Sequence, residues 1–393
     1  MPSRRRFLAL GAATALAGCT TVADEPPKPG STQSTNPDRH IYGADGEWSS
    51  FGCNASNTRG VGDGKAPVDG VTEKWRVEVP QTAYYEPLVV DGRVYQPTPE
   101  ELRVYDAADG SKLWSKAHVY ATPLVRDDIV YVGVRNRLLA LDSKTGETKW
   151  ERAFGENASV RTPSMYDSRW LYVPVGETVH RVSSLTGEVE WSRRLFGDIL
   201  GSSPIYIGYY VALATEAGKL YLLAPDGTGA GEWNLPSKPQ TPPTADTDGV
   251  YVNCLDGTTY GITLETQPRL NVDWKVETGV ASGGLAVEKH LYAAGARGLY
   301  AVDPEDGERV WKHDVGDWRW TAPALGRDTL FVGGDKLYAF DPTPSVRVPG
   351  TGPAKRFEKS FYGRVGPGPV LNDGVLYVVA QTGRRRWDLL ALE

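Results

Sequence analysis

Residues 140–150 read Ala-Leu-Asp-Ser-Lys-Thr-Gly-Glu-Thr-Lys-Trp. A short apolar run ends at Asp142, a turn follows around Gly146, and a second run ends at Trp150. Glycine permits the positive φ that a tight turn requires, and the aspartate can accept hydrogen bonds from the turn's own backbone. The stretch therefore predicts two short antiparallel strands joined by a tight turn.

The tryptophan of this stretch recurs along the chain. It returns at spacings of 36 to 42 residues, as Trp75, Trp114, Trp150, Trp191, Trp233, Trp274 and Trp311. Each repeat also holds an earlier motif, in which a proline, an apolar run, a turn and another apolar run follow one another. The prolines are Pro87, Pro123, Pro163, Pro204, Pro243, Pro323 and Pro369, and Gly283 stands at this position in the sixth repeat. The two motifs together define eight repeats.

Each repeat is long enough for four short strands. In the second repeat we expect strands at residues 123–125, 129–134, 138–142 and 147–150. Four strands repeated every forty or so residues are typical of a propeller blade, which must stack against neighbours to bury its faces. The seven tryptophans supply large apolar plates for that stacking. The sequence predicts an all-β, eight-bladed β-propeller of four-stranded antiparallel blades, with Phe357 replacing the missing tryptophan of the seventh repeat.

The two ends of the repeat region complement one another. The last repeat stops after its third strand, in residues 387–393, whereas Trp75 lies in a fourth strand with no first three strands before it. Pairing these ends would complete one shared blade and remove two exposed sheet edges. We therefore expect the ring to be closed by its own N-terminal strand.

The N-terminus has the pattern of an export signal. Ser3-Arg4-Arg5-Arg6-Phe7-Leu8 precedes a short apolar run and resembles a twin-arginine signal in which Arg4 and Arg5 are the paired arginines. Leu16-Ala17-Gly18-Cys19 resembles a lipobox, which implies lipidation of Cys19. The sequence predicts a signal peptide at 1–18, a flexible tether at 19–42 and the propeller at 43–393.

The repeat resembles a known family. Residues 140–150 are similar to the tryptophan-docking repeat of the pyrroloquinoline quinone (PQQ) propellers, and residues 301–311 match nearly as well. The resemblance covers residues 43–393 and implies two types of relative. Quinoprotein dehydrogenases hold PQQ and a metal at the ring axis, whereas BamB-like lipoproteins are non-enzymatic. Residues 47–59 resemble the leader of these families, which we expect to cap one face.

The residues that would carry enzyme chemistry are sparse. The dehydrogenases have an adjacent cysteine pair against the quinone, but this chain has only Cys19, Cys53 and Cys254. Its five histidines show no close metal-ligand spacing. We predict no catalytic residue, no metal and no cofactor, with PQQ and calcium as the weaker alternative. Lysine plus arginine number 43 and aspartate plus glutamate 49, a net charge of −6 that argues against a nucleic-acid partner.

Binding is the better-supported class of function. In this fold, the segments before each first strand open onto the axial funnel, and several carry aromatic or arginine side chains suited to recognition. The candidates are Tyr85, Arg161, Trp318, Trp320, Tyr362 and Arg364. We predict a monomeric, exported protein-binding scaffold, anchored by lipid to the outer face of the cytoplasmic membrane. Small-molecule or glycan binding in the funnel and a PQQ-dependent dehydrogenase are the alternatives.

Overall fold

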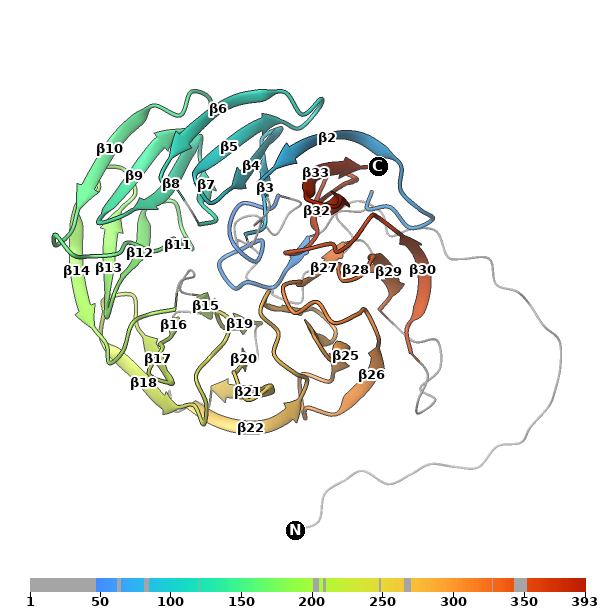
Figure 1. The fold of residues 1–393 in the computed structure, drawn as a ribbon. Helices are drawn as coiled ribbons and strands as arrows, with labels where there is room; N and C mark the ends of the chain where they lie inside the picture. Colours follow the sequence, from blue (N-terminus) through green and yellow to red (C-terminus); the bar gives the residue numbers. More distant parts are fainter. Residues whose placement is uncertain are drawn as a thin grey trace, which may run out of the picture.

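The computed structural model describes residues 47–61, 65–80, 85–119, 121–200, 205–207, 210–246, 249–264, 270–326, 328–342 and 352–393. These residues contain no helix and form eight β-sheets arranged as a ring around a central axis (Figure 1). The predicted all-β, eight-bladed propeller is therefore confirmed. Blades are numbered here in the order of the sequence repeats.

The first four blades are regular four-stranded meanders, numbered from the axis outward. Blade 1 comprises β3 (Leu88–Val90), β4 (Arg93–Pro97), β5 (Glu101–Asp106) and β6 (Lys112–Ala117). Blade 2 comprises β7 (Leu124–Arg126), β8 (Ile129–Val134), β9 (Arg137–Asp142) and β10 (Thr148–Ala153). Blade 3 comprises β11 (Ser164–Met165), β12 (Trp170–Val175), β13 (Thr178–Ser183) and β14 (Val189–Arg194). Blade 4 comprises β15 (Ile205–Ile207), β16 (Tyr210–Ala214), β17 (Lys219–Leu223) and β18 (Gly229–Asn234).

The other four blades include the two that recruit strands from the N-terminal part of the chain. Blade 5 comprises β19 (Thr244–Ala245), β20 (Gly249–Asn253), β21 (Thr258–Leu264) and β22 (Leu270–Glu277). Blade 6 comprises β23 (Leu285–Val287), β24 (Leu291–Gly295), β25 (Gly298–Val302) and β26 (Arg309–His313). Blade 7 comprises β27 (Pro323–Gly326), β28 (Thr329–Val332), β29 (Leu337–Asp341), β30 (Ala354–Lys359) and the added β1 (Gly60–Val61). Blade 8 comprises β31 (Val370–Asn372), β32 (Val375–Gly383), β33 (Arg386–Leu392) and β2 (Glu73–Val79).

Blade 8 closes the ring with both ends of the repeat region. The N-terminal strand β2 pairs antiparallel with the C-terminal strand β33, with Trp75 opposite Ala391. The pairing continues beyond the strands, because the backbone N–H of Thr72 donates to the Glu393 carbonyl at 2.7 Å and receives a bond in return. Closure by the chain's own N-terminal strand, expected from the incomplete end repeats, is confirmed.

Burial falls from the axis outward, as the residue patterns require. The second strands are buried on both faces, as in β24, where all five residues are inaccessible. The outermost strands alternate or are largely exposed, as in β6 and β10. A strand covered on both faces by neighbouring blades must be apolar throughout, whereas an outer strand meets water on its edge. The core is therefore a series of layers between adjacent blades.

The recurring tryptophan fastens each blade to the next. The indole N–H of Trp114, at the end of blade 1, donates to the Ser143 carbonyl in the outer turn of blade 2 at 3.0 Å. Its ring lies against Gly146, where an added Cβ would come within 2.6 Å of the indole. Asp142 holds that turn by accepting backbone N–H bonds at 2.9 and 3.0 Å. The same indole-to-carbonyl contact joins Trp75 to Ala107, Trp150 to Ser184, Trp191 to Pro225 and Trp274 to Pro304.

The equivalent aromatic residues of the other blades occupy the same position in their sheets, as far as the structure describes them. Phe357 pairs with Ala339 in the register that Trp311 has with Ala301 in the previous blade, and its ring lies 6.2 Å from Phe331. Phe357 thus occupies the predicted plate position of blade 7. The corresponding turns for Trp233 and Trp311 fall in residues 265–269 and 343–351, outside the described residues.

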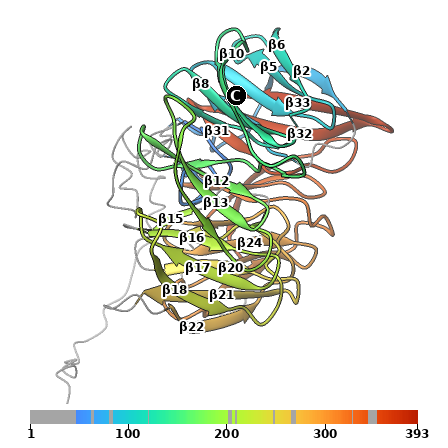
Figure 2. The same cartoon turned by 90° about the vertical axis from the view of Figure 1, so that its left-hand side faces the viewer.

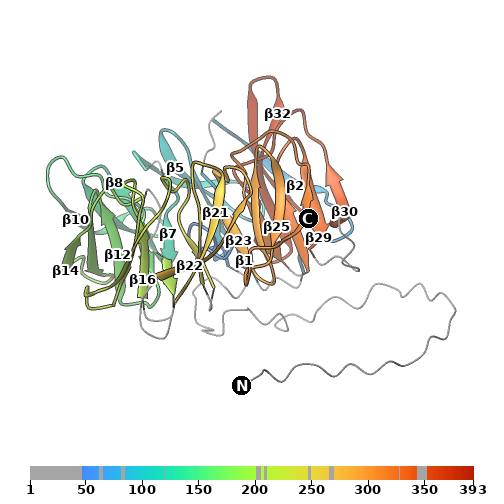
Figure 3. The ribbon, with the colours of Figure 1, turned by 90° about the horizontal axis from the view of Figure 1, so that it is seen from below.

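The loops divide between two faces of the ring, whose side views are given in Figures 2 and 3. Because successive strands are antiparallel, the loops between blades lie at the same end as the turns between second and third strands. We call this end the upper face; Leu255, in such a turn, donates its N–H to the Lys238 carbonyl of an interblade loop at 2.9 Å. The lower face carries the other two kinds of turn, including the turns that receive the tryptophans.

The close approach at Gly146 gives a direct test of the docking contact. Gly146→Ala is expected to destabilise the protein, because φ is +73° there and the new methyl group would collide with the Trp114 ring. The left-handed backbone costs about 1–2 kcal/mol and overpacking about 1–3 kcal/mol. Gly155→Ala is the matched control, since no atom lies within 4 Å of its Cβ position. Urea unfolding of both variants measures the difference, and equal stabilities would contradict the contact.

A half-buried histidine on β13 links stability to pH. His180 packs against Phe154 at 4.7 Å between ring centroids, and its Nδ1 lies 2.7 Å from Ser192 Oγ. Burial, together with the positive charge of Arg152, lowers the pKa of His180 to about 4. The pKa of a histidine in the unfolded chain is about 6.5. At pH values between about 4 and 6.5, this histidine is therefore protonated in the unfolded chain but neutral in the folded protein.

We expect the free energy of unfolding to fall as pH is lowered from about 6.5 towards 4, because protonation then favours the unfolded chain. His180→Gln should flatten this slope, leaving the smaller contribution of His313, whose pKa is also lowered by burial. Urea unfolding at a series of pH values measures both slopes. Parallel curves for the parent and variant would mean that His180 is not responsible.

Candidate functional site

The leader, residues 47–61, lies at the centre of the ring and is drawn in blue inside the propeller in Figure 1. Its backbone bonds to the innermost strands of five blades in turn. Trp48 exchanges two bonds with Val89, and the carbonyls of later leader residues accept N–H bonds from four more blades. These four bonds, of 2.8 to 3.0 Å, are Val125 to Ser49, Ala245 to Ser56, Val287 to Thr58 and Leu325 to Arg59. The leader therefore lies within the ring, rather than capping a face as the sequence suggested.

The leader begins at the lower face. Glu47 accepts a hydrogen bond at 3.4 Å from the backbone N–H of Asp91, which lies in the turn between β3 and β4. From there the segment runs inward, and its side chains are almost completely buried. Cys53 is fully buried within it, with its thiol directed at the carbonyls of Gly60 and Glu47. The leader is thus an integral part of the core.

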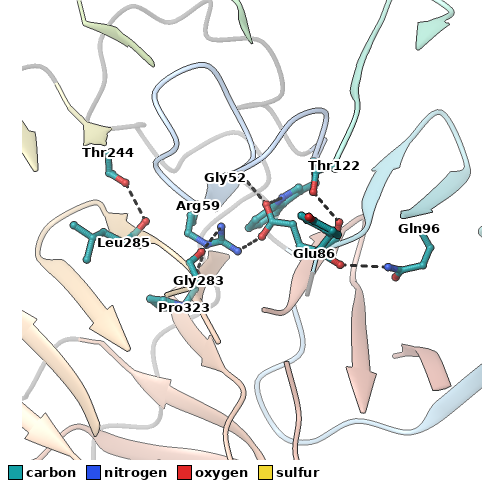
Figure 4. A network of polar contacts seen from close by, with 11 residues as sticks. Gly52, Arg59, Glu86, Gln96, Thr122, Thr244, Gly283, Leu285 and Pro323 are labelled. Carbon is teal, nitrogen blue, oxygen red and sulfur yellow. Dashed lines mark hydrogen bonds and ion pairs between the residues drawn. The ribbon is translucent and has the colours of Figure 1, made fainter. Parts of the chain in front are cut away.

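A buried ion pair joins the leader to blade 1 (Figure 4). The Arg59 guanidinium pairs with the Glu86 carboxylate, and the two side chains are 1% and 3% exposed. Arg59 Nε also donates to the Pro323 carbonyl at 2.9 Å. The other Glu86 oxygen accepts the backbone N–H of Gly52 at 2.7 Å and the indole N–H of Trp48 at 3.4 Å. Each charge therefore has several hydrogen bonds, which buried charges need to offset their desolvation.

Small residues make room for this arrangement. A Cβ on Gly283 would lie 2.3 Å from the Thr321 carbonyl oxygen, and a Cβ on Gly368 would lie 2.9 Å from the Arg59 guanidinium. Gly283 is the residue that replaces proline in the sixth repeat, and its carbonyl lies 3.5 Å from Arg59. This departure from the repeat therefore has a local cause, namely the close approach of Arg59 and the seventh blade.

Above the leader, a cavity of about 470 Å³ lies on the axis. The leader contributes Phe51 to its lining, and the interblade loops of the upper face contribute the rest. Tyr85 and Trp320 add two more aromatic side chains, and Arg161 is the charged lining residue among those described. Short polar side chains complete the wall, namely Thr122, Thr162, Gln240 and Ser282. The cavity thus combines three rings, one cation and several hydrogen-bonding groups.

The structure divides the six predicted funnel residues into two sets. Tyr85, Arg161 and Trp320 line the axial cavity. Trp318 and Arg364 lie outside its lining and stack on one another, with the guanidinium 4.6 Å from the indole centroid. Arg364 also pairs with Asp317 at 3.3 Å, and Tyr362 is 64% exposed. We call Trp318, Tyr362 and Arg364 the rim cluster, because they belong to the upper-face loops before blades 7 and 8.

The lining does not fit the metal-bound quinone of the dehydrogenases. None of its described residues is an aspartate or glutamate, and the nearby Glu86 is already engaged by Arg59. In the described parts of the chain, no three histidine, cysteine or acidic side chains gather in a way that would hold a metal ion. Calcium requires several oxygen ligands, usually including carboxylates. The described lining residues therefore provide no donor set for calcium-bound PQQ.

The two described cysteines are also unlike the quinone-stacking pair. Cys53 lies in the leader and Cys254 in blade 5, and both are buried free thiols. Burial raises the pKa of the Cys53 thiol well above its usual range and that of Cys254 to about 12. Because the thiolate is the reactive form, burial disfavours reaction of either cysteine at neutral pH.

Sequence reasoning missed the Arg59–Glu86 pair. Glu86 stands immediately before Pro87, where the other repeats have threonine, serine, proline, glycine or alanine. The sequence did contain one signal for this pair: Glu86 is charged, whereas the other repeats have small or uncharged residues at this position. The leader position of Arg59 offered no comparable pattern. Of the N-terminal predictions, Arg4, Arg5 and Cys19 lie outside the described residues.

The fold and its docking contacts define the class of protein: an eight-bladed propeller of the PQQ-like repeat type. A family model described as outer membrane protein assembly factor BamB matches residues 69–158, 99–247 and 295–392. The chain belongs to this family. No curated protein sequence matches the chain.

Solved structures share the fold at low sequence identity. BamB from Moraxella catarrhalis is 14% identical, with a TM-score of 0.62 over 82% of this chain and 97% of that one. Quinohemoprotein alcohol dehydrogenase from Comamonas testosteroni is 13% identical, with a TM-score of 0.64 over 88% and 80%. The computationally designed Ika8 protein is 12% identical, with a TM-score of 0.63 over 81% and 98%. An assembly factor, an enzyme and a designed protein thus share this architecture, and the function must be argued from the site.

We expect the buried Arg59–Glu86 ion pair to contribute strongly to the free energy of unfolding. Glu86→Gln leaves the Arg59 cation without its counter-charge in a dry environment, and removal of one partner of a buried pair costs about 3–5 kcal/mol. Glu151→Gln is the matched control, since the Arg137–Glu151 pair is half exposed and is expected to contribute under about 1 kcal/mol. Equilibrium urea unfolding compares the two, and a similar small loss in both variants would show that the axial pair is dispensable.

Proposed function

We propose that this protein is a non-enzymatic, exported binding scaffold that presents its upper face to a protein partner. Membership of the BamB family supports the proposal, since the family is named for an outer membrane protein assembly factor. The lining of the axial cavity supports it too, because it offers no carboxylate to act as a general base and its nearest buried carboxylate is occupied. The N-terminal motifs support export and lipidation at Cys19, which would hold the propeller at a membrane.

One observation carries the proposal. Large hydrophobic side chains are exposed on the upper face, where Phe196 is 66% and Tyr362 64% accessible. Phe196 lies in the loop between blades 3 and 4, and Tyr362 in the loop between blades 7 and 8. Leu255 and Tyr85 are exposed on the same face. Arg364 lies in the same loop as Tyr362 and stacks on Trp318 of the loop before blade 7. Aromatic and arginine side chains are the residues that contribute most to protein interfaces.

Crosslinking and capture from native membranes test the proposal. Tagged full-length protein is compared with a Phe196→Ser/Tyr362→Ser double variant, and we expect recovery of the principal partner to fall about tenfold or more, because each hot-spot truncation costs more than about 1 kcal/mol. Cys19→Ser should reduce recovery of membrane partners by releasing the anchor.

Leu185→Ser provides the matched control. Leu185 is 78% exposed, but it lies in a turn between the third and fourth strands of blade 3, on the lower face. Its replacement removes a strongly exposed apolar side chain without touching the upper face, and recovery should be unchanged. Equal recovery from all variants, or loss only with Leu185→Ser, would place the interaction elsewhere.

A further inference from the structure

The axial cavity holds an arginine that the fold itself does not use. Arg161 lines the cavity from the loop before blade 3, and its guanidinium has no ion pair or hydrogen bond with any described residue. Arg364, in contrast, is paired with Asp317, and Arg59 with Glu86. Partial burial of a cation is unfavourable unless a counter-charge is supplied. The described lining supplies none, so a bound anion would complete the site.

Neutral hydrogen-bonding groups are also available. The Gln240 amide and the Ser282 hydroxyl line the cavity, and neither side chain bonds to another described residue. Thr162, in contrast, donates to the Thr122 carbonyl at 2.6 Å, which fixes that part of the wall. The free groups come from blades 5 and 6, whereas Arg161 comes from blade 3. A ligand on the axis would therefore meet polar groups from several directions.

The aromatic side chains provide the complementary surface. Trp320 belongs to the loop before blade 7, four blades from Arg161 in a ring of eight, and so lies across the axis from it. Tyr85 and Phe51 add rings from blade 1 and from the leader. The ligand therefore faces flat apolar surfaces as well as the cation. The volume of about 470 Å³ falls within the range of small-ligand sites.

We propose that the axial cavity binds an acidic sugar, a hexuronate unit, with its carboxylate on Arg161 and its ring against the aromatic side chains. A guanidinium binds a carboxylate through two parallel hydrogen bonds. The ring hydroxyls of the sugar satisfy Gln240 and Ser282, and its C–H face packs on an indole or phenyl ring. A purely aromatic carboxylate would use the arginine but leave those polar groups desolvated and unpaired.

Titration calorimetry of the full-length protein tests this site with D-glucuronate, D-glucose and benzoate. We expect saturable binding of glucuronate, with glucose and benzoate at least tenfold weaker, because each lacks one half of the recognition. Binding of glucuronate should also weaken with rising salt. Absence of saturable glucuronate binding, or equal binding of glucose or benzoate, overturns the proposal.

Variants locate the interaction. Arg161→Gln should weaken glucuronate binding at least tenfold, to the level of glucose, and Arg161→Lys should recover part of the loss. Arg364→Gln is the matched control and should bind normally, because Arg364 lies outside the cavity lining. Thermal unfolding verifies that each variant is folded, which we expect because Arg161 is only partly buried and its guanidinium is unpaired among the described residues. Undiminished binding by Arg161→Gln overturns the site.

The sugar site and the scaffold role are separable by experiment. Phe196 and Tyr362 are not among the residues that line the cavity, so their double replacement should leave glucuronate binding unchanged. Arg161→Gln should conversely leave protein capture from membranes unchanged. Loss of one readout with retention of the other identifies which of the two proposals fails.

Discussion

A propeller blade is a sheet with two apolar faces, and neither face is stable until a neighbour covers it. Closing the ring is therefore the constraint on which every other contact depends. The chain meets it twice. Strand β2 pairs with β33 at the circumference of the ring, and the leader bonds to five blades at its centre. The Arg59–Glu86 pair connects the leader to the segment just before the innermost strand of blade 1.

The sequence predicted the features that repeat. Trp150 and Gly146 each stand for a position that is repeated in most blades. The repetition arises because each indole ring packs against a turn of the next blade, and that turn has no room for a side chain at its glycine. The incomplete end repeats likewise predicted ring closure, since an unpaired strand edge is unfavourable. Phe357 was identified from the same periodicity, although its blade carries an insertion before it.

Structural features that occur only once in the chain could not be predicted from the repeated pattern. The path of the leader depends on contacts between residues far apart in sequence, such as Arg59 with Pro323, which no local pattern encodes. For the same reason, Tyr85, Arg161 and Trp320 could be identified as funnel residues, but not separated from the rim cluster. All of these side chains belong to upper-face loops, and the path of each loop determines whether its side chain lines the axial cavity or belongs to the rim cluster. The architecture, shared with an assembly factor and a dehydrogenase, leaves function to these unrepeated residues.

The leader enters the ring on the face opposite the axial cavity. Glu47, the first residue that the structure describes, contacts the turn between β3 and β4 at the lower face. If Cys19 carries a lipid, as proposed, the link to the membrane would join the ring at this lower face. The axial cavity and the exposed aromatic side chains belong to the opposite, upper face, whereas the turns that receive the tryptophans share the lower face with the entry point of the leader.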